Sequence, residues 1–265
     1  MEKVYYIRHP WHGFWTGMYL ITGNDGHILV DSAFENAITD TLEPFLKNIG
    51  SSLDSIKYVI NTHAHGDHVE GNAKLRELTP AKFGIFHTGA ESLRHSGFEP
   101  DILLYDDMTL DWCGSSIKII HTPGHSDDSI CILEQTTGTL MTGDSIQGKG
   151  SLNIGLALYQ NPAEYRKSLL KIKELCLAKK IRRIMLGHPE LPARSGVVEE
   201  PEVLSYINDS ILTVDNYTKT AQELIRENPK ADRALLRNRL LELYGVDKNP
   251  SWPELSYGTA GAYLK

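Results

Sequence analysis

The segment NTHAHGDHVEGN, residues 61–72, constrains the fold more than any other part of the sequence. The apolar run IKYVIN, residues 56–61, predicts a buried strand that leads directly into it, and NAKLREL predicts a helix after it. Four polar residues lie within six positions, namely His63, His65, Asp67 and His68. The chain must therefore fold a strand end, a turn and a helix start around these side chains.

These four side chains are potential metal ligands. His63 and His65 point the same way in an extended segment, and a chain reversal at Gly66 can bring Asp67 and His68 toward them. Neutral imidazole and carboxylate are the ligands that zinc, iron and manganese prefer. If the four residues only capped the next helix, three clustered imidazoles would have no role. The segment therefore predicts a metal site.

Three later stretches share one feature, a predicted strand that ends in a glycine-containing turn with a possible ligand. They are HTPGHSDDS with His125, LMTGDS with Asp144 and MLGHPE with His188. A single histidine or aspartate after a strand is more often a hydrogen-bonded turn residue. Together with the first cluster, and in this order, the three stretches make a specific pattern.

The remaining patterns predict how the chain is divided. Residues 17–32 form a hairpin pattern that turns at Asn24-Asp25-Gly26, and residues 36–48 follow as a predicted helix. A second helix starts at Asn161, with Pro162 at its first position and Glu164 completing a capping box. Long amphipathic helices dominate after Pro201. We therefore expect a layered αβ catalytic domain at residues 1–200 and a helical C-terminal extension at residues 201–265.

Amino-acid composition limits which partners the protein is expected to bind and where in the cell it is expected to be. The 265 residues can bury a good core, so a metal would be catalytic rather than structural. The net charge is −7 and no strongly basic block occurs, which argues against tight nonspecific nucleic-acid binding but leaves room for a local basic groove. Cys113, Cys131 and Cys176 are widely spaced and outside any CxxC pair. Without an N-terminal leader pattern or a membrane-length apolar run, we expect a cytoplasmic protein that does not bind membranes.

The combined motifs resemble the metallo-β-lactamase superfamily over roughly Met18–Pro189. Its signature is HxHxDH, then a histidine after Thr-Pro-Gly, an aspartate in a Gly-Asp pair and a last histidine. The resemblance implies an α+β fold, a four-layer αββα sandwich, here with a helical C-terminal extension. It implies two metal sites whose ligands are His63, His65 and His125 for one ion and Asp67, His68 and His188 for the other, with Asp144 bridging both.

The resemblance also implies a chemistry. Two divalent ions, zinc by default with iron or manganese as alternatives, would activate a shared water as a bridging hydroxide. Asp67 would be the catalytic residue that orients this nucleophile. We expect a small acyl substrate, such as a thioester, a lactone or another ester. No serine or cysteine nucleophile is needed.

Two other functions stay open. The stretch from His121 to Gly150 resembles most closely a lactamase-like branch that includes a single-strand endoribonuclease, so a phosphodiesterase acting on single-stranded RNA is the first alternative. Its phosphate contacts would be Lys149, Arg182, Arg183 and Arg194, although each suits a solvated surface equally. The second alternative is a non-catalytic metal-binding protein, against which the intact set of seven ligands speaks. The flavo-diiron branch is disfavoured because it carries glutamate where this chain has His65.

Aromatic residues near the N-terminus bear on the substrate. Trp11, Phe14 and Trp15 lie in a predicted loop, and we expect them to form an apolar wall for an acyl chain or ring; ordinary packing is the alternative. The C-terminal helices are expected to cover the site or to mediate a homodimer. Tyr257 and Tyr263 lie in a segment that the pattern favours as a frayed tail.

Overall fold

The computed structural model of the protein describes residues 3–151, 153–247 and 250–265. These residues divide into two compact units. Unit 1 comprises the described residues up to His121 together with Asp127–Gly143, and unit 2 comprises Thr122–Ser126 and the described residues from Asp144 onward. Within the described ranges, no helix has both the length and the apolar content needed to cross a bilayer.

Unit 1 contains a mixed sheet of six strands in sequence order. The strands are β1 (Val4–Trp11), β2 (Phe14–Gly23), β3 (Gly26–Val30), β4 (Ile56–Asn61), β5 (Lys82–Phe86) and β6 (Ile102–Leu104). The first three strands are antiparallel, and the pairs from β3 to β6 are parallel. The parallel strands end at the same edge of the sheet, which is where the histidine segment follows β4.

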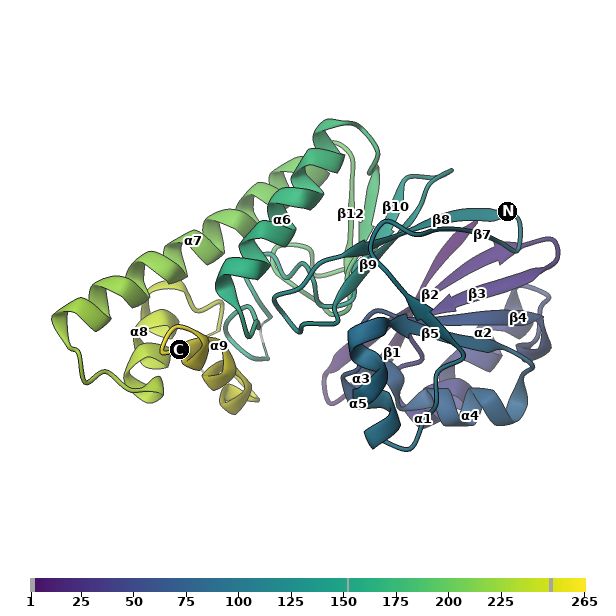
Figure 1. Cartoon of the computed structure of the whole chain (residues 1–265), viewed down its shortest axis with the longest axis horizontal. Coiled ribbons are helices and arrows are strands. Elements are labelled where there is room, and N and C mark those ends of the chain that lie inside the picture. The colour runs from purple at the N-terminus through teal and green to yellow at the C-terminus, as the bar shows by residue number, and fades with distance from the viewer. Residues whose placement is uncertain (1–2, 152, 248–249) are drawn as a thin grey trace. The chain divides into compact units, whose positions relative to one another are not determined.

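Helices cover one face of this sheet (Figure 1). They are α1 (Glu35–Ala37), a π-helical turn (Ile38–Leu42), α2 (Glu43–Asn48), α3 (Gly66–Val69), α4 (Gly71–Leu78) and α5 (Ala90–His95). Their apolar residues, among them Ile38, Leu42 and Leu75, are buried against the sheet residues Met18 and Val59 in one core. The sheet and these helices thus bury a shared apolar layer, which fixes where the strand ends lie.

Unit 1 also contains four antiparallel strands in the order β10-β9-β8-β7. These strands are β7 (Thr109–Trp112), β8 (Ser115–His121), β9 (Ile130–Glu134) and β10 (Thr139–Met141). Every residue of β9 and β10 is buried. Strands β9 and β10 form an antiparallel hairpin, and Gly138 has a φ of 69° in its turn.

Unit 2 is mainly helical. Its elements are α6 (Pro162–Leu177), β11 (Arg183–Met185), β12 (Val197–Glu199), α7 (Val203–Glu227), α8 (Arg233–Tyr244) and α9 (Ser256–Ala262). Helices α6 and α7 pack side by side, and α8 and α9 lie beside each other near the end of α7 (Figure 1). The described residues after Pro201 are therefore mainly helical, as expected, whereas the domain boundary at residue 200 stays a prediction.

The end of the chain differs from the frayed tail that the pattern favours. Residues 256–262 form α9, and the Tyr263 hydroxyl lies 2.7 Å from the Tyr159 hydroxyl. Tyr159 is 2% exposed and stacks on Tyr165, so the half-buried Tyr263 is anchored by its hydroxyl to the core of unit 2. Apolar burial and this hydroxyl pair order a segment whose composition alone favours fraying.

The start of α6 gives a stability prediction. The Asn161 side chain accepts a hydrogen bond of 3.2 Å from the Glu164 amide, which is the expected N-cap. Replacing Asn161 with Ala is expected to lower the free energy of unfolding by about 1 kcal/mol, because that amide loses its partner. Urea denaturation measures the change. The control Glu174→Ala, at an exposed position of the same helix, should change it by less than about 0.5 kcal/mol; equal effects in both variants would contradict the capping role.

Candidate metal centre

The ends of two neighbouring parallel strands bring the first polar groups of unit 1 together. Val30 of β3 pairs with Ile60 of β4, so Asp31 and Thr62 follow adjacent strand ends. The Asp31 carboxylate accepts hydrogen bonds from the Thr62 amide at 2.7 Å and from the Thr62 hydroxyl at 2.8 Å. Asp31 is completely buried, so these bonds satisfy its carboxylate and fix its position.

His68 is held by the same carboxylate. Its Nδ1 lies 2.8 Å from Asp31 Oδ2, and the ring is completely buried. Burial raises the pKa of Asp31, whereas His68 and the hydrogen bonds from Thr62 act in the opposite direction. With Nδ1 donating to Asp31, Nε2 of His68 is the nitrogen that can bind a metal. Such carboxylate–histidine pairs orient metal ligands in proteins.

His63 and His65 present two nitrogens to a common space. His63 Nε2 lies 3.0 Å from His65 Nδ1, and the Thr62 hydroxyl lies 3.1 Å from His63 Nδ1. Two imidazole nitrogens bound tetrahedrally to one zinc ion would be about 3.3 Å apart, given the usual bond length. The separation in unit 1 therefore fits two ligands of one ion.

Asp67 and His68 make a second pair of possible ligands in the same segment. Asp67 Oδ2 lies 3.6 Å from His68 Nε2, and its side chain is 25% exposed. The His63 and His68 rings are 4.3 Å apart between centroids. All four predicted residues of the first cluster thus converge within unit 1, and Asp67 is the one whose carboxylate stays accessible to water.

In unit 2 the turn that carries His125 packs against helix α6. Gly124 has a φ of 139°, and a Cβ placed on it would lie 2.3 Å from Tyr165 Cα. Only glycine allows this approach, so the Thr-Pro-Gly turn is fixed where α6 begins. His125 Nδ1 donates a hydrogen bond to the Leu158 carbonyl at 2.9 Å. This bond leaves Nε2 of His125 as the nitrogen that can bind a metal.

The Asp144 carboxylate lies between two imidazoles of unit 2. Its Oδ2 is 3.4 Å from His125 Nε2, and its Oδ1 is 3.4 Å from His188 Nε2. Each oxygen of one carboxylate therefore faces a different imidazole. The buried, oxygen- and nitrogen-rich donor set fits divalent metals.

One residue that supports these ligands is not predicted by any sequence pattern. Gln147 is 4% exposed, accepts a hydrogen bond from the Leu158 amide at 2.6 Å and donates one to the Leu158 carbonyl at 2.8 Å. Its amide also donates to the Asp144 carbonyl at 2.9 Å. Gln147 therefore connects the His125 turn, the Asp144 turn and the loop at Leu158. A polar residue three positions after Asp144 is too common a pattern to signal this role.

Two buried carboxylates were also missed. Asp31 closes the apolar strand ILV, so a charged residue at a buried strand end was the available signal. Glu190, two residues after His188, is 3% exposed, and burial raises its pKa to about 8, with His188 opposing that shift. Asp31 hydrogen-bonds the His68 ring and Glu190 interacts electrostatically with His188, and both interactions depend on the folded chain.

The three predicted aromatic residues lie in strands rather than in a loop. Trp11 ends β1 and pairs with Phe14 at the start of β2, so these two share one face of the hairpin. Trp15 lies on the opposite face, where its ring is 5.5 Å from that of Tyr6. Trp11 lies 4.9 Å from Phe34, whereas Phe14 is buried. Sequence alternation places the three residues on two faces, so they do not form a single wall in the hairpin.

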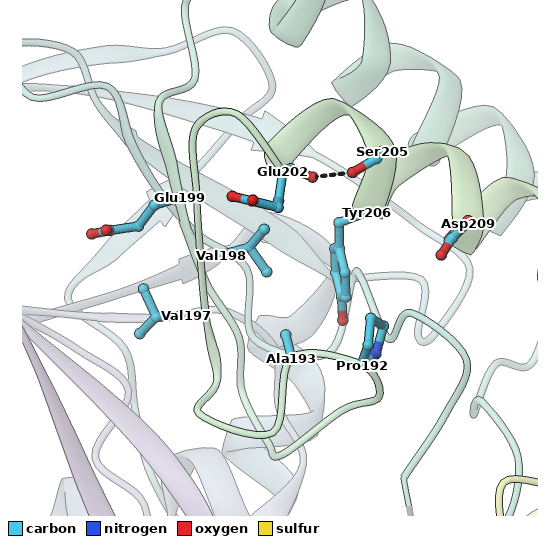
Figure 2. Close-up of a pocket in the computed structure, with 9 residues that line it drawn as sticks. All are labelled: Pro192, Ala193, Val197, Val198, Glu199, Glu202, Ser205, Tyr206 and Asp209. Atoms are coloured by element: carbon cyan, nitrogen blue, oxygen red, sulfur yellow. Dashed lines mark hydrogen bonds between the residues drawn. The ribbon is translucent and has the colours of Figure 1, made fainter.

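A separate hollow of about 260 Å³ lies within unit 2 (Figure 2). Its lining comes from the loop at Pro192, from β12 and from the first turns of α7. Glu199, Glu202 and Asp209 carry its charges, and none of the predicted ligands lines it. This hollow is therefore distinct from the ligand clusters.

Comparison with known proteins identifies the family. The family model of the metallo-beta-lactamase superfamily matches residues 17–188, which include all seven predicted ligands. The chain belongs to the metallo-beta-lactamase superfamily. This result confirms the resemblance inferred for Met18–Pro189.

Individual relatives of this superfamily chain support the same assignment. A beta-lactamase-like protein 2 homolog of Caenorhabditis elegans is 30% identical over 187 residues, which cover 70% of this chain and 59% of that protein. A hydroxyacylglutathione hydrolase of Pelagibacter ubique is 32% identical over 155 residues, or 57% of this chain and 62% of that protein. The chain thus covers less than two thirds of these relatives.

A solved structure shows the fold. A metallo-beta-lactamase family protein from Thermus thermophilus has a TM-score of 0.75 and 19% identity, with 100% of this chain and 92% of that chain covered. The predicted α+β fold, the αββα metallo-β-lactamase sandwich with a helical C-terminal region, is therefore confirmed.

Proposed function

We propose that this metallo-beta-lactamase superfamily protein is a dinuclear metal-dependent hydrolase of small acyl substrates. One ion would be held by His63, His65 and His125, and the other by Asp67, His68 and His188, with Asp144 bridging them. The observation that carries the proposal is the Asp144 carboxylate, whose two oxygens each lie 3.4 Å from a different imidazole. Zinc is the default metal, and iron or manganese would suit the same donors.

Different residues would have different roles in the proposed reaction. Two bound divalent ions would lower the pKa of a shared water and polarise the substrate oxygen. The accessible carboxylate of Asp67 would accept a hydrogen bond from the attacking water and orient it. Asp31 and the Leu158 carbonyl hold the rings of His68 and His125 so that each presents Nε2. The relative named hydroxyacylglutathione hydrolase supports an acyl substrate, such as a thioester, a lactone or another ester.

The competing functions are separated by one set of measurements. Elemental analysis should find about two metal ions per chain, and an activity panel should show hydrolysis of esters, thioesters or lactones. Cleavage of single-stranded RNA that weakens steeply with salt, without carbonyl hydrolysis, would instead support the phosphodiesterase. Bound metal without turnover of any substrate would support a non-catalytic metal-binding protein. A cytoplasmic location is proposed from the widely spaced cysteines.

Asp67 gives a direct test of the proposed chemistry. Asp67→Ala is expected to lower kcat by a factor of about 10² to 10⁴, since the attacking water loses the group that orients it. Because the side chain is 25% exposed, the thermal unfolding temperature should change little. Steady-state kinetics and a melting curve measure both quantities. Full activity in Asp67→Ala would remove this residue from the mechanism.

A further inference from the structure

The loop before α6 orients the His125 ring, and the end of the chain fixes this loop. Residues 157–159 belong to no helix or strand, so no regular element sets the Leu158 carbonyl that bonds His125. We propose that Thr259 of α9 is a positioning residue for the metal centre, because its hydroxyl fixes the backbone on both sides of Leu158. This inference rests on the proposed role of His125 as a metal ligand, and it gives the C-terminal helices a part in metal binding.

The Thr259 hydroxyl makes two hydrogen bonds to the loop. It donates to the Ala157 carbonyl at 2.9 Å and accepts from the Tyr159 amide at 3.2 Å. Thr259 is completely buried, so both bonds are shielded from bulk water. Leu158 lies between the two bonded residues, and its carbonyl accepts from His125 Nδ1 at 2.9 Å. One hydroxyl thus sets the backbone on either side of the group that orients the imidazole.

The Thr259 hydroxyl bonds differently from three hydroxyls of α7. A serine or threonine within a helix commonly donates to the carbonyl four positions earlier. Ser210, Thr213 and Thr218 do so at 2.8–2.9 Å. Thr259 instead bonds loop residues that are 100 and 102 positions away in sequence. Its hydroxyl therefore connects α9 to the loop.

The end of the chain contacts the same loop at two further points. The Trp252 amide donates to the Asn153 carbonyl at 2.8 Å, and the Val246 amide donates to the Gly155 carbonyl at 2.9 Å. Together with the two bonds of Thr259, the bonded groups come from residues 153, 155, 157 and 159. The loop therefore turns alternate residues toward the C-terminal segment.

Leu158 turns its backbone groups to the ligand side. Its amide donates to Gln147 Oε1 at 2.6 Å, and its carbonyl accepts from Gln147 Nε2 at 2.8 Å and from His125 Nδ1. A displacement of the loop would move this carbonyl, and the imidazole would lose the partner that leaves Nε2 for the metal. Partners of this kind, which bond the ligand rather than the ion, contribute about 10- to 100-fold to metal affinity.

The side chain of Tyr159 is bonded to the same part of the chain. Its hydroxyl lies 2.7 Å from the Tyr263 hydroxyl, which in turn lies 3.3 Å from the Thr218 hydroxyl of α7. Tyr159 is therefore fixed through its side chain as well as through its backbone. Removing the Thr259 hydroxyl is expected to loosen the loop and to leave the fold intact, so its effect should lie at the lower end of that range.

The test uses the full chain and the variant Thr259→Val, which keeps a branched side chain and removes the hydroxyl. Zinc affinity, measured by competition with a chelating dye, is expected to fall about tenfold for one ion per chain. The Tyr159 amide should exchange its hydrogen about tenfold faster, because its acceptor is gone. Thr259→Ser retains a hydroxyl and should restore both values to within about twofold of wild type.

Thr220→Val is the matched control. Thr220 is a buried threonine of α7, and its hydroxyl donates to the Tyr244 hydroxyl of α8 at 3.1 Å rather than to the loop. The control removes one buried hydroxyl from the helical part of unit 2, so its urea midpoint should fall as in Thr259→Val. Its zinc affinity should stay within about twofold of wild type.

The outcomes separate the positioning role from the hydrolase function. Zinc affinity unchanged in Thr259→Val, or lowered equally in Thr259→Val and Thr220→Val, would overturn the positioning role, even if the wild type hydrolyses acyl substrates. A wild type that hydrolyses no acyl substrate, with a zinc affinity that depends on the Thr259 hydroxyl, would contradict the proposed function and support the positioning role.

Discussion

Replacing Asp144 with Asn is expected to lower kcat/KM of the metal-loaded protein by about a thousandfold and to reduce the metal content per chain. The two carboxylate oxygens lie 3.4 Å from His125 Nε2 and 3.4 Å from His188 Nε2, so under the proposed function each could share an ion with a different imidazole. An amide keeps one neutral oxygen and replaces the other with an NH₂ group, which is not a metal ligand. Losing several kcal/mol of charge stabilisation in the transition state corresponds to this factor.

The control for Asp144→Asn lies next to it in the same turn. The Ser145 hydroxyl bonds the Thr122 hydroxyl at 2.8 Å and is buried, so Ser145→Ala disturbs the turn without removing a ligand. We expect this control to cost about 1 kcal/mol of stability and to keep its metals. Elemental analysis, steady-state kinetics and urea denaturation compare the two variants. An Asp144→Asn protein that retains its full metal content and turns over at nearly the wild-type rate would contradict a bridging carboxylate.

The first ligand cluster was accessible from sequence because its geometry is local. Strand β4 and helix α3 form from adjacent stretches of sequence, an apolar run and then a glycine. The four predicted ligands His63, His65, Asp67 and His68 lie within six residues at this junction, so local folding brings them together. The later strand-and-turn patterns then predicted His125, Asp144 and His188, and unit 2 brings these three together around one carboxylate. The assignment of all seven residues to two ions stays a proposal.

The supporting residues were not accessible, because their contacts are long-range. Asp31 bonds His68 across 37 positions of sequence, and this contact exists only because β3 and β4 pair in parallel. Gln147 bonds Leu158 through both of its amide atoms, a pairing that depends on a loop without a regular pattern. Periodicity reports which face of an element is apolar, and it carries no information on which distant polar group meets another.

The aromatic residues near the N-terminus show how strand register determines which side chains share one face of a hairpin. The pattern grouped Trp11, Phe14 and Trp15 as one apolar wall, yet the pairing of Trp11 with Phe14 turns Trp15 to the other face. Phe34, which no sequence pattern indicates, lies beside Trp11. A two-residue period means that a tight turn at residues 12–13 fixes these faces, whereas a longer loop would not.

Replacing Asp31 with Asn is expected to weaken metal binding by about 10- to 100-fold and to lower the free energy of unfolding by about 2–4 kcal/mol. The buried Asp31 carboxylate accepts from the Thr62 amide, the Thr62 hydroxyl and His68 Nδ1. An Asn side chain has one acceptor oxygen, so its NH₂ group would face donors. Because asparagine tolerates the left-handed φ of 58° at this position, backbone strain does not explain the loss.

The comparison with Ser32→Ala separates ring orientation from general stability. Ser32 is also buried, and its hydroxyl donates to the carbonyl of His68 at 3.3 Å rather than to its ring. Its removal should cost about 1 kcal/mol of stability and leave metal affinity unchanged. Competition with a chelating dye measures the affinity, and urea denaturation with and without EDTA measures the stability. Equal losses of affinity in the two variants would mean that Asp31 acts only through the fold; a loss confined to Asp31→Asn would mean that its carboxylate holds the His68 ring for the metal.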